Sequence, residues 1–300
     1  MQRRRSRGLR GIPVSALEFL ETRILPAVTV SFNAGSGRLT LKGNGASDSV
    51  SLEGTGVVGN VHAYVNGVYN NTFVGVQSLV ANLKGGNDTL NLSSFVISGD
   101  VTIKMGSGGD IFDVDNVTDF SPGPDTGMSF GGDLNVKMGS NPGDLIRFDV
   151  SAGDFIQVHG NASFIGAADV NLDGDGGSFL VEGDDIHFFD NLKIDFSPWG
   201  DVDGDLNNLT MDDANVSNAR TIICSVADDR IEIGDSAFGE EVTVQLSFGN
   251  NLFDVDLAGD ANDFQGLLTL RGVFGIDTYD ASGANQFAFA PVLIGIEMVI

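Results

Sequence analysis

The 300-residue sequence has one cysteine, Cys224, and only three histidines. A lone cysteine excludes an intramolecular disulfide and a cysteine-based zinc site. His62, His159 and His187 form neither a His-Glu-x-x-His motif nor a His-x-His pair, so each is expected to be an ordinary strand residue. The sequence therefore shows no motif of a zinc enzyme.

Positive charge is also scarce. Sixteen lysines and arginines face 41 acidic residues, which gives a formal net charge of −25. Six of the basic residues are arginines in the first 26 positions, so the chain from Leu25 onward carries 39 acids against 10 bases. Nucleic acids and anionic membrane surfaces bind basic protein surfaces, and both are therefore excluded as partners. No apolar run approaches ~18 residues, so no membrane-spanning segment is predicted.

Glycine and aspartate are abundant instead. The chain contains 41 Gly, and 33 Asp against 8 Glu. Asp and Gly favour turns whereas Glu favours helix interiors, so the composition predicts strands joined by tight turns. The hydrophobic fraction of 42% is enough for a core, and the length allows one large or two ordinary domains.

Residues 1–26 differ from the rest of the chain. A basic start leads into a capping-box pattern and the run LEFLETRIL, which predicts a short helix over about residues 15–24. The string Leu20-Glu21-Thr22-Arg23-Ile24-Leu25 resembles the L-E-x-R-x-L motif at the N-termini of planctomycete extracellular proteins. That resemblance implies export to the cell surface or beyond. The alternative is an ordinary capped helix that packs on the edge of the domain.

Residues 27–75 alternate between apolar and polar side chains and predict an antiparallel β start to the domain. An Asn66-Gly67 pair between two such runs is the signature of a two-residue hairpin turn.

Residues 76–300 contain a repeat. The string IKMGS at 103–107 recurs as VKMGS at 136–140, each copy introduced by Gly-Asp, and FDVD at 112–115 recurs at 253–256. The unit is an apolar strand, a Gly-Asp-Asn turn and a second apolar strand, with spacings of 20–35 residues. This pattern predicts an all-β fold, a right-handed parallel β-helix or β-solenoid, with an apolar C-terminal cap. Phe112, Phe148, Phe179 and Phe253 are expected to stack inside it. A two-sheet β-sandwich is the alternative.

Two of the turns resemble the G-G-x-G-x-D-x-U nonapeptide of RTX calcium-binding β-rolls. They are residues 105–112 (MGSGGDIF) and 84–90 (KGGNDTL). The resemblance implies Ca²⁺ between stacked turns, held by Asp88, Asp110 and Asp144, because calcium prefers carboxylate and carbonyl oxygens. The nonapeptides do not run in tandem here, and the third turn carries Asn141-Pro142. The alternative is that these aspartates cap backbone N–H groups in the turns.

Further acidic clusters are candidate metal sites. Asp201, Asp203, Asp205 and Asp212 follow the spacing of an EF-hand or dockerin loop, although Leu206 stands where that loop requires Gly. Asp173 and Asp175 form a weaker candidate. Solvated loops are the alternative in both places.

The sequence favours a protein without catalytic activity. Parallel β-helices include polysaccharide lyases, so the fold permits catalysis without implying it. Asp184-Asp185 resembles a carboxylate pair, but a groove for acidic uronans requires basic residues that the body of the chain lacks.

We expect an exported structural or adhesive β-solenoid of the cell surface or matrix, either monomeric or part of a surface assembly. Surface glycans or other extracellular proteins are the expected partners. The alternative is a carbohydrate-active or carbohydrate-binding β-helix, whose groove would use Trp199, Tyr64, Tyr69 and Tyr279.

Overall fold

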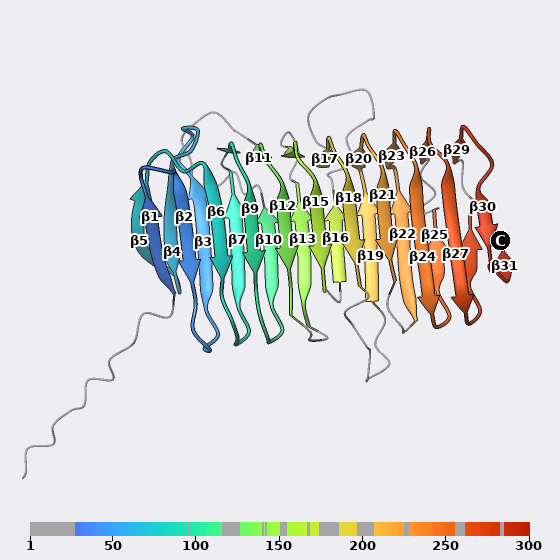
Figure 1. The fold of residues 1–300 in the computed structure, drawn as a ribbon, viewed down its shortest axis with the longest axis horizontal. Coiled ribbons are helices and arrows are strands. Elements are labelled where there is room, and N and C mark those ends of the chain that lie inside the picture. Colours follow the sequence, from blue (N-terminus) through green and yellow to red (C-terminus); the bar gives the residue numbers. More distant parts are fainter. Residues whose placement is uncertain are drawn as a thin grey trace, which may run out of the picture.

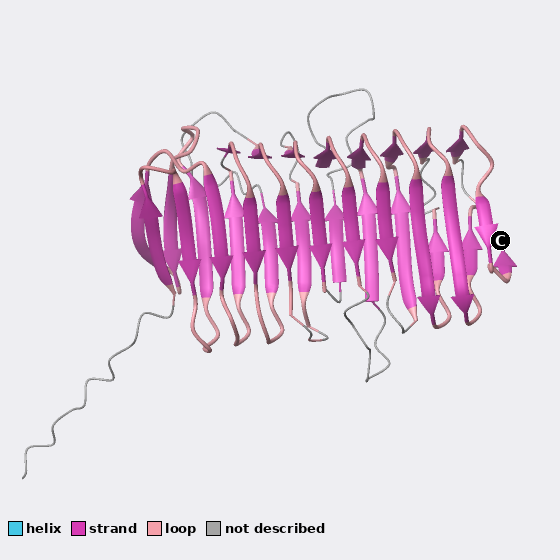
Figure 2. Ribbon diagram, viewed as in Figure 1, coloured by secondary structure: helices cyan, strands magenta, loops and turns pink. Residues whose placement is uncertain are grey.

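The computed structural model describes residues 28–300 except positions 95, 116–126, 140, 142, 151–154, 167–168, 174–185, 197–206, 225–227, 256–261 and 283–284. The helix expected at 15–24 and the resemblance to planctomycete proteins lie outside the described residues. The described part is all-β, as Figure 2 shows. It contains no helix long and apolar enough to cross a membrane.

The strands form three sheets. Sheet 1 has, in spatial order, β1 (Thr29–Asn33), β2 (Arg38–Lys42), β6 (Ser78–Asn82), β9 (Val101–Lys104), β12 (Leu134–Lys137), β15 (Ala162–Ile165), β18 (Leu192–Asp195), β21 (Arg220–Ile223), β24 (Val242–Phe248), β27 (Leu268–Phe274) and β30 (Val292–Ile294). Sheet 2 has β5 (Val68–Phe73), β4 (Val61–Val65), β3 (Ser49–Gly54), β7 (Thr89–Ser93), β10 (Ile111–Asp115), β13 (Leu145–Asp149), β16 (Asp169–Asp173), β19 (Asn207–Asp212), β22 (Asp229–Gly234), β25 (Leu252–Asp254), β28 (Thr278–Asp280) and β31 (Met298–Val299). Sheet 3 has β8 (Val96–Ile97), β11 (Met128–Phe130), β14 (Ile156–Val158), β17 (Ile186–Phe188), β20 (Ala214–Val216), β23 (Ala237–Phe238), β26 (Asp263–Phe264) and β29 (Gln286–Phe287).

The chain visits the three sheets in turn, so β9, β10 and β11 complete one coil and β12 begins the next (Figure 1). Strands one coil apart pair in parallel, for example β9 with β12 and β10 with β13. This is the predicted parallel β-helix. The alternative β-sandwich is wrong, because parallel strands from successive coils form three sheets here.

The IKMGS repeat marks the coil period. Val136 pairs with Ile103 and Lys137 with Lys104, so the two copies lie directly one above the other. Antiparallel pairs occur at the N-terminal end, where β1 pairs with β2 and β3, β4 and β5 form a meander. The β4–β5 turn has positive φ at Asn66 (52°) and Gly67 (73°), as the predicted hairpin requires.

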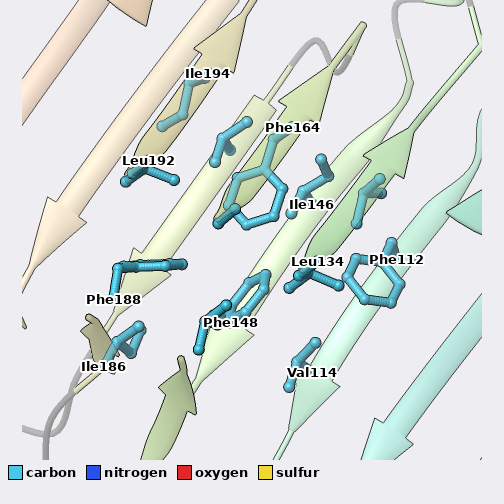
Figure 3. Packing of buried hydrophobic residues seen from close by; sticks show 14 of the residues in the cluster. Phe112, Val114, Leu134, Ile146, Phe148, Phe164, Ile186, Phe188, Leu192 and Ile194 are labelled. Carbon is cyan, nitrogen blue, oxygen red and sulfur yellow. The ribbon is translucent and has the colours of Figure 1, made fainter. Parts of the chain in front are cut away.

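Inward-facing apolar residues fill the centre of the coils (Figure 3). The expected stack of four phenylalanines does not form. Phe112 pairs in register with Ile146, and Phe148 pairs with Val114, so the two rings meet edge-on at 6.1 Å from adjacent columns. Phe179 lies outside the described residues. A continuous stacked row of rings occurs instead in sheet 3, where Phe264 lies 4.7 Å from Phe238 and 5.0 Å from Phe287.

Candidate functional site: the aspartate ladder

The turns between sheet 1 and sheet 2 stack directly on one another. The turn at 105–110 contacts the turn at 84–88 through a parallel bridge between Gly85 and Ser107 and through backbone hydrogen bonds. A Cβ on Gly106, whose φ is +119°, would lie 1.8 Å from the carbonyl oxygen of Lys84. A Cβ on Gly139 would lie 1.9 Å from the carbonyl oxygen of Gly106. The repeated glycines therefore allow successive turns to approach this closely.

An aspartate ends each of the first four turns, and a hydrogen bond joins each of these aspartates to the one in the next coil. The backbone N–H of Asp48 donates to Oδ1 of Asp88 at 2.9 Å, and that of Asp88 to Oδ1 of Asp110 at 2.8 Å. The N–H of Asp110 donates to Oδ1 of Asp144 at 2.8 Å. We call Asp48, Asp88, Asp110 and Asp144 the aspartate ladder. It joins coils that are 22 to 40 residues apart in sequence.

The row of hydrogen-bonded turn residues before sheet 2 continues toward the C-terminus, where Asn and Glu take part as well as Asp. The N–H of Asp229 donates to Oδ1 of Asn251 at 2.9 Å, and Nδ2 of Asn251 donates to Oδ1 of Asp277 at 2.8 Å. The N–H of Asp277 donates to Oε2 of Glu297 at 2.9 Å. Asn251, Asp277 and Glu297 immediately precede a strand of sheet 2, as the four ladder aspartates do, and Asp229 is the first residue of β22.

The ladder carboxyl groups are buried, with exposed fractions between 0 and 4%. The Oδ2 atoms of Asp48, Asp88 and Asp110 have no hydrogen-bond partner among the described residues. Burial, with a smaller contribution from the carboxylates of Asp110 and Asp48, raises the pKa of Asp88 to about 6, although the hydrogen bond from the Asp48 N–H opposes this shift. Burial likewise raises the pKa of Asp144 to about 7 and the pKa of Asp110 above its ordinary value.

The described residues bring no cluster of metal-ligating side chains together at the ladder. They contain no group of three or more His, Cys, Asp or Glu side chains that could hold an ion. Calcium takes six to eight oxygens, whereas the ladder supplies one carboxylate per coil, with one oxygen already bound to a backbone N–H. The alternative interpretation of Asp88, Asp110 and Asp144 is confirmed in kind. Their Oδ1 atoms accept backbone N–H groups of the preceding coil, and Oδ2 of Asp144 also accepts the N–H of Asn141 in its own turn at 3.3 Å.

The other candidate metal residues are distributed differently. Asp175, Asp201, Asp203 and Asp205 lie outside the described residues. Asp173 ends β16 and Asp212 ends β19, and the two are register partners. The strands therefore bring together two acids that the sequence assigned to separate clusters, and Asp149 of β13 is the next partner in that row.

Two further rows of polar side chains join coils at the other corners, and sequence reasoning missed both as ladders. Before sheet 1, Oδ1 of Asp100 accepts from the N–H of Asp133 at 3.1 Å, and Oδ1 of Asp133 accepts from the N–H of Asn161 at 2.9 Å. Before sheet 3, Oδ1 of Asn262 accepts from the N–H of Ser236 at 3.0 Å. A small polar residue directly precedes several of these strands, among them Asp100, Asp133 and Asn161 before strands of sheet 1 and Ser236 and Asn262 before strands of sheet 3. That recurrence is the signal that could have found the two rows.

A shallow hollow of about 220 Å³ lies along sheet 3, lined in part by His187, Ser217 and Gln265. Nε2 of His187 is 3.0 Å from Oγ of Ser217, and the His187 ring stacks on Phe189 at 3.9 Å. Burial and the nearby His159 lower the pKa of His187. No carboxylate is among the described residues that line this hollow.

Residues 127–131 (GMSFG) match the spacing Gly-x-Ser-x-Gly. Ser129 lies in the middle of β11 and pairs with Gln157 of β14. A nucleophile elbow requires a sharp turn between a strand and a helix, so this string is not one.

Comparison with protein-family models, with curated proteins and with solved structures finds no match to this chain. Proposals on function therefore rest on its own residues and geometry.

Proposed function

We propose that the protein is an exported, non-catalytic β-helix that serves as a structural or adhesive component of the cell surface or extracellular matrix. The observation that carries the proposal is the unbroken stack of coils, bonded at their corners by side chains of the neighbouring coil. The eleven strands of sheet 1 at a spacing of ~4.8 Å give a rod on the order of 50 Å long. A stiff rod of this kind is suited to a spacer or scaffold.

The high negative charge of the chain supports a role in an ordered assembly, because it opposes nonspecific contact between rods. At a net charge of −25, the sides of two rods repel each other, which opposes aggregation through lateral contact. Surface glycans or other extracellular proteins are the proposed partners. Export is supported by the arginine-rich start and the motif at Leu20–Leu25.

The carbohydrate-binding alternative has less support. The three of its four candidate aromatic residues that the structure describes do not gather on one surface. Tyr64 and Tyr69 contact each other on the β4–β5 hairpin with ring centroids 5.7 Å apart, whereas Tyr279 is buried at the opposite end with 4% of its surface exposed. Trp199 lies outside the described residues.

Localisation tests the proposal. The full chain, tagged at its C-terminus, is expressed in a planctomycete, and intact cells are probed with a tag antibody and with added protease. We expect surface labelling and protease sensitivity in the wild type, and retention inside the cell for the Glu21→Ala/Arg23→Ala variant. The control variant Gln2→Ala/Ser6→Ala, which leaves the motif intact, should behave as the wild type. Wild-type protein confined to the interior of the cell would contradict the proposal.

A panel of purified polysaccharides tests the alternative. Saturable binding that is lost in the Tyr64→Ala/Tyr69→Ala variant, while the Val58→Ala variant still binds, would favour carbohydrate recognition over a purely structural role.

A further inference from the structure

The outer surface of sheet 3 is hollowed where two small residues fall in one coil. Ala237 of β23 lies in the outward row of the sheet, in register with Asn215 of the coil before. Gly239 follows the same strand and lies between Ser217 and Gln265, the residues that follow the neighbouring strands β20 and β26. The two small residues leave the hollow of about 220 Å³ on the outside of β17, β20, β23 and β26, which are neighbours in the sheet (Figure 1).

The polar groups at the hollow donate and accept hydrogen bonds. Asn215, Ser217 and Gln265 line it with amide and hydroxyl groups, and His187 lines it from β17. Nε2 of Gln265 donates to Oδ2 of Asp263 at 3.1 Å, which holds the Gln265 side chain at the edge of the hollow. Burial lowers the pKa of His187, so its ring is neutral at pH 7. The hollow therefore suits a ligand that is uncharged and rich in hydrogen-bonding groups.

Flat ring surfaces lie beside these polar groups. The His187 ring stacks on Phe189 at 3.9 Å, and the ring of the exposed His159, one coil before, stacks on Phe189 at 4.6 Å. Ligand sites combine such aromatic surfaces with a few polar groups that fix the orientation of the ligand. A pyranose ring matches both features, because its C–H groups pack on aromatic rings and its hydroxyls donate and accept hydrogen bonds.

A row of hydrogen-bonding side chains extends from the hollow along the rod. Ser129, Gln157 and His187 are register partners on the outside of β11, β14 and β17, and Asn215 is the next residue of the row. Successive members lie one coil apart, at a spacing of ~4.8 Å, which is close to the length of one sugar unit in a linear glycan. The row therefore offers contacts to consecutive units of a glycan that runs along the rod.

The charge of the chain distinguishes between classes of glycan. At a net charge of −25 the rod repels uronates and sulfated sugars. A cationic ligand would require carboxylates in the hollow, and none is among the described residues that line it. A neutral glycan avoids both the repulsion and that requirement.

We propose that the hollow on sheet 3 binds one unit of a neutral, hydroxyl-rich glycan, whose further units lie along the row from Ser129 to Asn215. The proposal rests on the proposed function, whose glycan partner it specifies. Binding is measured on the purified chain and export in cells, so failure of this site is distinguishable from failure of the proposed function.

Saturation-transfer difference NMR and isothermal titration calorimetry of the full chain test the proposal. The probes are short neutral oligomers of glucose, mannose, galactose, xylose and N-acetylglucosamine, with oligogalacturonate as the acidic counterpart. We expect saturable binding of at least one neutral oligomer and no binding of oligogalacturonate. Ser217→Ala/Gln265→Ala should weaken binding by about tenfold, because two hydrogen bonds to the ligand are lost. Tyr64→Ala/Tyr69→Ala, on the β4–β5 hairpin, should bind as the wild type does.

Ala237→Phe tests the shape of the site. It fills the hollow from an outward position of β23, where strands accept aromatic residues, and should abolish binding while the circular dichroism spectrum is retained. The matched controls face outward on sheet 1, where Ser163→Ala/Gln245→Ala and Thr221→Phe should leave binding unchanged. Binding of none of the neutral oligomers would overturn the proposal. So would a preference for oligogalacturonate, binding that survives both sheet 3 variants, or binding that the sheet 1 controls also abolish.

Discussion

The backbone N–H of Asp110 donates to the carboxylate of Asp144, 34 residues further along the chain, at 2.8 Å. The same relationship joins Asp88 to Asp110 and Asp48 to Asp88, so one aspartate per coil bonds the coil before it. The four aspartates are buried, and the Oδ2 atoms of Asp48, Asp88 and Asp110 have no hydrogen-bond partner among the described residues. Burial also raises the pKa of Asp88, Asp110 and Asp144. The ladder thus holds the coils in register while it places negative charge inside the fold.

Replacing Asp110 separates these two effects. Asp110→Asn keeps an acceptor for the N–H of Asp88 and removes the buried charge, as Asn251 does in the same column. We expect it to raise the free energy of unfolding near pH 8 by about 1 kcal/mol. Asp110→Ala loses the acceptor and should lower the free energy of unfolding by about 1–3 kcal/mol. Urea unfolding measures both.

Asp100→Asn is the matched control for that pair. Asp100 also accepts a neighbouring coil's N–H, but at an exposed position. Its effect should stay within about 0.5 kcal/mol. A loss of stability in Asp110→Asn as large as in Asp110→Ala would show that the charge itself is required.

Stability should decrease as the pH rises from about 5 to about 8. Asp88 and Asp144 have folded-state pKa values of about 6 and about 7, above the ordinary value of 3.8. Between the ordinary and the raised values the folded chain binds more protons than the unfolded chain. The resulting stabilisation is complete below the ordinary pKa and is lost as the pH rises through the raised values. Urea midpoints against pH should fall over this window, and Asp88→Asn/Asp144→Asn should flatten the curve. An equally steep curve in the double variant would assign the dependence to other groups.

Close stacking of the turns predicts a strong penalty at Gly106. A Cβ there would overlap the carbonyl of Lys84, and φ is +119°. Gly106→Ala should therefore cost more than about 2 kcal/mol. Gly45→Ala is the control, because a Cβ at Gly45 meets nothing within 4 Å. Thermal melting of both variants makes the comparison, and equal melting temperatures would contradict the stacked geometry.

Arg220 is a buried cation in an otherwise apolar column, between Leu192 and Val242. It is 3% exposed, its guanidinium lies 4.9 Å from the centre of the Phe238 ring, and burial lowers its pKa to about 9. Nε and one terminal nitrogen have no partner among the described residues. Arg220→Met should raise the free energy of unfolding by about 1 kcal/mol in urea unfolding.

The control for Arg220 is Arg230→Met, which removes an exposed arginine paired with Glu232 and should change stability by less than about 0.5 kcal/mol. Destabilisation by Arg220→Met of more than about 1 kcal/mol would mean that the contact with Phe238 outweighs the cost of burial.

The sequence predicted the coil because the repeat and the fold have the same origin. The IKMGS string recurs because only glycine allows successive turns to stack this closely. An aspartate recurs at the end of each turn because a backbone N–H of the preceding coil needs an acceptor there. The sequence did not reveal the true partners of the phenylalanines, since variable loops between coils hide the register and shift Phe148 by two residues relative to Phe112. Nor did it distinguish a carboxylate that accepts a hydrogen bond from the preceding coil from one that holds an ion. That distinction depends on where stacking directs the side chain.

Amide hydrogen exchange at Asp110, followed by NMR in the presence of EDTA, tests most directly whether the ladder aspartates bond the coils rather than hold calcium. We predict slow exchange of the Asp110 amide in the wild type and in Asp144→Asn, and fast exchange in Asp144→Ala, with no change on adding Ca²⁺ or Mg²⁺. An Asp110 amide that exchanges rapidly in EDTA and becomes protected only when Ca²⁺ is added, and not with Mg²⁺, would contradict the account.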